Sequence, residues 1–67
     1  MKLSPTRIKI IILLAKGFSD KEISQHLQMS VRTVQTHVNA ILMVLNARNR
    51  TNAVAKYMQA NPLKIVL

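Results

Sequence analysis

Residues 17–45, GFSDKEISQHLQMSVRTVQTHVNAILMVL, carry a pattern typical of two short helices joined by a tight turn. In the second half, apolar residues recur at intervals of three and four, which gives a helix one apolar side: Val31, Val34, Val38, Ile41 and Leu45. The opposite side has no acid and consists of Arg32, Gln35, Thr36, Asn39 and Met43. A helix with a buried stripe and a face rich in amides and hydroxyls is suited to the major groove of DNA.

Residues at the ends of these helices support the same interpretation. Ser19 and Glu22 have the spacing of a capping box. Gly17 is the only glycine of the chain and stands where a preceding helix needs a left-handed residue. Gln28 and Met29 form the expected turn, and Ser30 is expected to cap the helix that follows.

One further helix is expected before this stretch and one after it. Ser4 and Pro5 are suited to starting a first helix, whose apolar residues cover more than one stripe: Ile8, Ile10, Ile11, Ile12, Leu13, Leu14 and Ala15. Such a helix is either buried on most sides or keeps an apolar patch for a partner.

A fourth helix is expected over residues 52–60, with Thr51 as its cap and Asn61 as a left-handed end. Its apolar face is expected to consist of Ala53, Val54, Tyr57 and Met58. Tyr57 and Met58 are expected in the core, and the apolar residues 63–67 are expected to pack on another surface.

Composition limits the possible functions. The chain has 67 residues, enough for one small domain, and lacks cysteine. His26 and His37 accompany only two acids, which makes a poor metal site, and no pair of groups suggests an enzyme or a bound cofactor. His26 is expected at the surface and His37 in a half-buried structural position. The apolar run 10–15 is too short to span a bilayer, and no cleavage site follows it, so we expect a cytoplasmic protein.

Charge favours a polyanionic partner. Ten Lys and Arg residues against two acids give a net charge of +8. Nucleic acid agrees with the helical pattern better than an anionic membrane surface does, since Gly17 and Ser19 interrupt any long amphipathic helix. The alternative is that these basic residues only keep a small domain soluble.

Four stretches of the chain together resemble the DNA-binding domain of LuxR/FixJ/NarL-type bacterial transcription regulators, among them response regulators. They are LSP at 3–5, LLAKGFSDKEIS at 13–24, MSVRTVQTHV at 29–38 and LNARNRTNAV at 45–54. The resemblance implies one all-α domain over residues 1–67, a compact four-helix fold that contains a helix-turn-helix. It also implies a recognition helix at about 31–45 and a dimerisation helix at about 52–60, hence a weak homodimer.

The resemblance further implies site residues and partners. Gln35, Thr36 and Asn39 match the positions that contact bases, and Lys21, Arg32 and Thr33 match those that contact the phosphate backbone of double-stranded DNA. Such domains usually follow a regulatory domain, so a regulatory domain or protein partner is possible. The sequence departs from the family pattern at Gln28, where glycine is common, and at Met43, near which a basic residue is usual.

Alternatives stay open for several of these residues. Gln35 and Asn39 could be ordinary solvated amides, although amides pair well with adenine edges. Arg48 and Arg50 could contact phosphates or serve only solubility. For the whole chain, the alternative to sequence-specific DNA binding is a protein-interaction module, which would keep the helix-turn-helix scaffold and bind another regulator through Ile10, Leu13 and the apolar tail.

Overall fold

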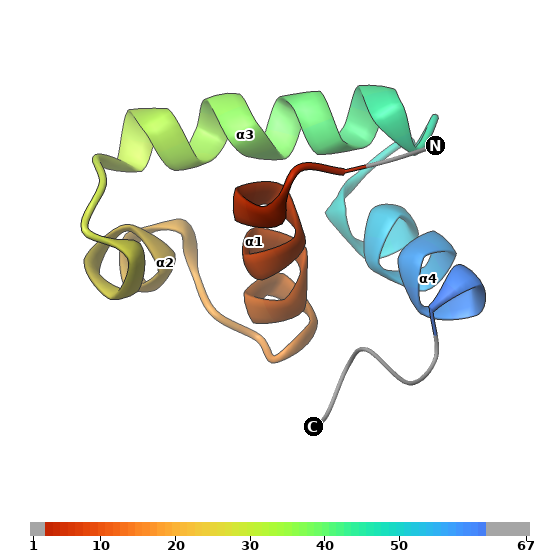
Figure 1. The fold of residues 1–67 in the computed structure, drawn as a ribbon, viewed down its shortest axis with the longest axis horizontal. Helices are drawn as coiled ribbons and strands as arrows, with labels where there is room; N and C mark the ends of the chain where they lie inside the picture. Colours follow the sequence, from red (N-terminus) through yellow and green to blue (C-terminus); the bar gives the residue numbers. More distant parts are fainter. Residues whose placement is uncertain (1–2, 62–67) are drawn as a thin grey trace.

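Four α-helices form the secondary structure of residues 3–61, the part of the chain that the computed structural model describes. They are α1 (Pro5–Ala15), α2 (Asp20–Leu27), α3 (Val31–Val44) and α4 (Arg50–Ala60). In Figure 1, α3 runs along one edge of the molecule, and α2 and α4 lie on either side of α1. Helix α3 contacts each of the other three helices. The all-α fold with a helix-turn-helix, formed by α2 and α3, is therefore confirmed.

The sequence signals for three helix starts are confirmed. The hydroxyl oxygen of Ser4 accepts a hydrogen bond from the Arg7 N–H at 3.3 Å, and Pro5 is the first residue of α1. Ser30 accepts the Thr33 N–H at 3.0 Å at the start of α3. At the start of α2 the capping box is complete, because Glu22 N–H donates to Ser19 Oγ at 3.2 Å and Ser19 N–H donates to Glu22 Oε1 at 2.9 Å. Each bond satisfies a backbone N–H that has no partner within its helix.

Three left-handed residues end helices within residues 3–61. Gly17 has a φ of 91° and closes α1 with Schellman-type bonds, in which the Phe18 N–H reaches the Leu13 carbonyl at 3.0 Å. Gln28 follows α2 with a φ of 56° and a ψ of 49°, as the tight turn requires. Asn46 has a φ of 52° after α3. Glycine has no Cβ and asparagine tolerates the left-handed conformation, so Gln28 is the one of the three residues for which it is sterically unfavourable.

We expect Gln28→Gly to stabilise the fold by about 1 kcal/mol, because glycine adopts the left-handed conformation without the steric cost that glutamine bears. Thermal melts followed by circular dichroism measure this gain. Asn46→Gly is the matched control and should gain less, since asparagine tolerates positive φ. Equal gains at the two positions, or a loss at Gln28, would show that the turn is not strained.

The core forms where all four helices meet. Its most deeply buried side chains come from three of them: Ile10 and Ile11 of α1, Ile23 of α2, and Val34, Val38 and Ile41 of α3. Helix α4 adds Ala53 and Tyr57. Burial of the apolar stripe of α3 in this core supplies the packing that the β-branched residues of the helix need to remain helical.

Burial also corrects several expectations. Ile10 and Leu13 are buried in the core, so these two residues are not exposed to a protein partner. Val31 and Met58 are exposed, at 37% and 36%, although both were expected to be buried. Val31 is the first residue of α3, ahead of the buried part of the stripe. The predicted packing of residues 63–67 lies outside the described part of the chain.

The ends of two helices also differ from the sequence prediction. Helix α4 begins at Arg50, two residues before the predicted start, and Asn49 is its cap in place of Thr51, accepting the Asn52 N–H at 2.8 Å. Asparagine and threonine both serve as caps, so the local sequence did not separate them. Helix α3 ends at Val44, with Leu45 as its C-cap. Asn61 ends α4 with a φ of −139° and not in the left-handed conformation.

Candidate nucleic-acid interface

The outer side of α3 is the feature that distinguishes this helix from the rest of the molecule. All the residues predicted on that side are exposed: Arg32, Gln35, Thr36, Asn39 and Met43. Val34, Val38 and Ile41 turn to the core on the opposite side, which fixes the rotation of the helix about its own axis. The structure thus presents a guanidinium, two amides and a hydroxyl along one solvent-facing row. Met43, 81% exposed, extends this row toward the end of the helix.

Two hydroxyls near the start of α3 are engaged within the chain. Thr36 donates to the Arg32 carbonyl at 3.0 Å, so its donor is used inside the helix and its oxygen lone pairs and methyl group remain for other contacts. Ser30 donates to Thr33 Oγ1 at 2.9 Å. Both Thr33 and Thr36 stay exposed. The amide of Asn39, by contrast, makes no side-chain hydrogen bond to any residue of the range 3–61.

The basic residues fall into two groups. Three have partners inside the domain: Arg50 with Asp20, Lys56 with the Leu45 and Asn46 carbonyls at 3.3 and 2.8 Å, and Arg7 with His37. Within residues 3–61, the other five make no side-chain hydrogen bond or ion pair, and all are exposed: Lys9, Lys16, Lys21, Arg32 and Arg48. Lys21 and Arg32, which match the positions of phosphate contacts, and Arg48, a further candidate, are therefore available for such a contact.

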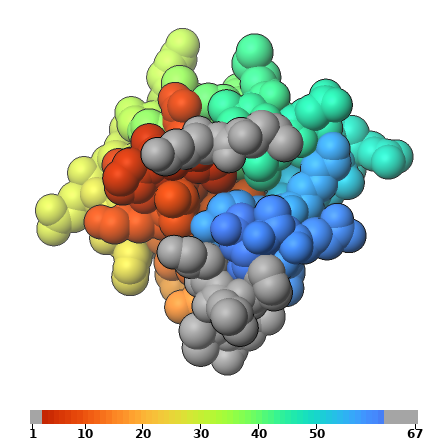
Figure 2. Space-filling model, turned by 45° about the vertical axis from the view of Figure 1, so that its right-hand side comes forward, coloured from red at the N-terminus to blue at the C-terminus, as the bar shows by residue number. Residues whose placement is uncertain are grey.

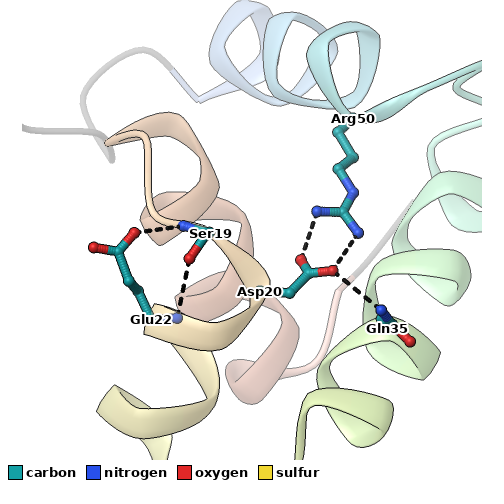
Figure 3. A network of polar contacts seen from close by, with 5 residues as sticks. All are labelled: Ser19, Asp20, Glu22, Gln35 and Arg50. Carbon is teal, nitrogen blue, oxygen red and sulfur yellow. Dashed lines mark hydrogen bonds and ion pairs between the residues drawn. The ribbon is translucent and has the colours of Figure 1, made fainter.

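A polar network joins three helices beside the row on α3. Both carboxylate oxygens of Asp20, at the start of α2, accept from the Arg50 guanidinium at 2.5 and 2.7 Å (Figure 3). The Gln35 amide nitrogen on α3 donates to Asp20 Oδ2 at 3.5 Å. The hydrogen bonds from Arg50 are the main cause that lowers the pKa of Asp20 below its usual value. Arg50, one of the candidate phosphate contacts, is therefore bound to a carboxylate.

This network was not foreseen from the sequence, which indicated only a structural role for both acids at the start of α2. Asp20 and Arg50 are 30 residues apart, and no local pattern pairs them. The other acid, Glu22, stays in its capping box, and its hydrogen bond with the Ser19 backbone lowers its pKa. Since both acids have partners, neither contributes an unpaired carboxylate beside the exposed row.

The two histidines take the positions expected of them. His37 is half-buried, and its Nδ1 accepts from Arg7 Nε at 3.4 Å, a contact that ties α3 to α1. His26 is exposed and packs edge-on against the Phe18 ring, with 5.8 Å between ring centroids.

Other kinds of site were sought over residues 3–61. No three His, Cys, Asp or Glu side chains of this range gather where they could hold a metal ion. None of its helices combines the length and apolar character needed to cross a bilayer.

Comparison with known proteins identifies the family of the chain. Residues 1–57 match the family described as bacterial regulatory proteins, luxR family. Over 59 residues the chain is 39% identical to the response regulator protein VraR of Staphylococcus aureus, and the same figures hold for the proteins of that name from Staphylococcus epidermidis and Staphylococcus saprophyticus. The match covers 88% of this chain and 28% of each relative, so the chain spans little more than a quarter of their length. The chain belongs to the luxR family of bacterial regulatory proteins and has the helix-turn-helix domain with which transcription regulators of this family bind DNA.

Proposed function

We propose that the protein binds double-stranded DNA sequence-specifically and regulates transcription by inserting α3 into the major groove. The observation that carries this proposal is the exposed, acid-free row on α3, opposite the buried side chains of Val34, Val38 and Ile41 on the same helix. A buried stripe fixes which side chains face outward, and a fixed row of donors and acceptors is what base-edge recognition requires.

Each residue of the predicted site has a proposed role. Gln35 and Asn39 lie one helical turn apart and contact base edges, since an amide offers a donor and an acceptor that match adenine. Thr36 contacts the same groove through its methyl group or oxygen lone pairs. Lys21, Arg32 and Thr33 contact phosphates, which fix the position of the domain on the duplex.

We further propose a weak homodimer through α4 and a cytoplasmic location, where bacterial DNA lies. Helix α4 has exposed residues beyond its buried Ala53 and Tyr57, with Met58 the largest apolar one among them. In Figure 2 this helix, in blue, lies at the surface of the molecule. Two half-sites about one helical turn apart should follow. Sedimentation showing one chain on each bound duplex would argue against the dimer.

Asn39→Ala should weaken binding to the specific duplex by about 1–3 kcal/mol and leave binding to a scrambled duplex nearly unchanged, because the lost amide contacts only bases. Arg32→Ala is the matched comparison on the same face. It should weaken binding to both duplexes, because a phosphate contact does not depend on sequence.

The measurement is the affinity of each variant for both duplexes at one salt concentration, with circular dichroism to verify folding. A specific duplex must first be obtained by selection from a randomised pool with the parent protein. If Asn39→Ala and Gln35→Ala both bind that duplex like the parent, this face does not contact bases and the proposed function fails.

A further inference from the structure

We infer that Asp20 is a positioning residue that fixes the side-chain amide of Gln35 and thereby sets base preference at one position of the DNA site. This inference rests on the proposed function, since it assumes that Gln35 contacts a base. Asp20 itself lies on α2, outside the row on α3, and acts through Gln35.

The geometry joins the two residues directly. Gln35 Nε2 lies 3.5 Å from Asp20 Oδ2, and Figure 3 shows the amide nitrogen turned toward the carboxylate and the amide oxygen turned away from it. The bond is long, but Asp20 is itself held firmly, because two hydrogen bonds from Arg50 bind both of its oxygens. Its side chain is only 16% exposed, whereas Gln35 is exposed. A fixed group thus orients a solvent-facing one.

The chemistry of Asp20 determines which end of the amide it holds. An ionised carboxylate only accepts hydrogen bonds, so it selects the nitrogen of Gln35 and not the oxygen. The amide nitrogen carries two N–H groups, and one of them is used by Asp20. The carbonyl oxygen and the second N–H remain, which are the acceptor and donor that the N6 and N7 atoms of adenine require. Fixing the amide excludes the flipped orientation, in which the oxygen and the nitrogen of the Gln35 side chain would exchange places relative to the base.

The ion pair with Arg50 explains how the Asp20 carboxylate can lie beside the row of α3 that is proposed to bind DNA. An unpaired acid at this place would repel phosphates, but the bidentate guanidinium offsets the charge of Asp20. Arg50 therefore acts on the row of α3 through Asp20. This arrangement brings together α2, α3 and α4, so the orientation of Gln35 depends on the packing of all three.

Asp20→Asn is the informative variant, and Glu22→Gln is its matched control. Each replaces one acid in the first turn of α2 by its amide of equal size, but only Asp20 contacts Gln35. Glutamine at position 22 can still complete the capping box. Asparagine at position 20 can either donate or accept, so it no longer selects one end of the Gln35 amide.

The experiment selects duplexes from a randomised pool with the 67-residue parent, Gln35→Ala, Asp20→Asn and Glu22→Gln. The position at which Gln35→Ala loses base preference is the one that Gln35 contacts. We expect Asp20→Asn to lower the preference for adenine at that position by about five-fold or more. This loss is a part of the discrimination that a bidentate contact provides. Glu22→Gln should keep the parent's preference. Both variants should bind a scrambled duplex somewhat better than the parent, because each removes one negative charge.

The possible failures can be separated. If Gln35→Ala leaves every base preference unchanged, the proposed function is wrong at this residue. If Gln35→Ala relaxes one position and Asp20→Asn keeps the parent's preference there, the positioning role of Asp20 is overturned. A relaxation by Asp20→Asn that persists undiminished in the Gln35→Ala background would also overturn it, because the effect must pass through Gln35. Preference is a ratio of affinities for two duplexes, so partial unfolding does not alter it, and Asp20→Ala provides a second variant without any acceptor.

Discussion

Ile41→Ala should remove most of the stability of this domain. Ile41 is fully buried in the last turn of α3, within the core that the helices share. Truncating a buried isoleucine to alanine costs about 2–5 kcal/mol, through lost burial and the cavity left behind. A domain of this length has a total free energy of unfolding of roughly 3–10 kcal/mol. We therefore expect a variant that is partly unfolded at room temperature.

The measurement is urea unfolding followed by circular dichroism, with Met43→Ala as the control. Met43 lies two residues further along the same helix and is 81% exposed, so its truncation should change the free energy of unfolding by less than about 0.5 kcal/mol. If the two variants unfold at similar urea concentrations, α3 does not pack as described and its outer face is not fixed.

Binding to duplex DNA should weaken by on the order of a hundred-fold between 50 and 200 mM salt. The reason is counterion release, which gives a slope of about −0.9 for each phosphate neutralised, and the estimate assumes about four such contacts. A net charge of +8 makes the contribution of counterion release to binding large, and both acids are already engaged inside the domain. A salt titration of the affinity for a scrambled duplex measures it.

Lys21→Ala and Lys16→Ala make a matched pair for that titration. Lys21 lies in the first turn of α2, within the helix-turn-helix, and its loss should reduce the slope by about one. Lys16 caps the C-terminal end of α1, which lies away from α3 in Figure 1, and its loss should change the slope much less. Equal changes would mean that DNA is held by general charge and not by the helix-turn-helix.

Local signals predicted most of this fold correctly. Ser4, Ser19 and Ser30 each start a helix where the sequence indicated, and Gly17 holds the left-handed conformation expected of it. Such features depend on bonds between residues three to five apart, so a short window of sequence contains their cause. The exposed side of α3 follows in the same way from helical spacing.

Features that depend on distant contacts could not be predicted. The ion pair of Asp20 and Arg50 joins residues 30 positions apart, and the start of α4 lies at the residue that makes this pair. Lys56 binds carbonyls at the end of α3, where its charge stabilises the negative end of the helix dipole. The link between Asp20 and Gln35 appears only when α2 and α3 are packed together.

The insertion of α3 into the DNA groove can be tested at the level of single residues by nuclear magnetic resonance. The measurement is a titration of isotope-labelled protein with the selected duplex, following backbone and side-chain amide signals. We predict that the largest changes fall on the outer row of α3, including the side-chain amides of Gln35 and Asn39, with smaller changes at Lys21. Changes confined to α1 or α4, with the signals of Gln35 and Asn39 unmoved in the saturated complex, would contradict groove insertion by α3.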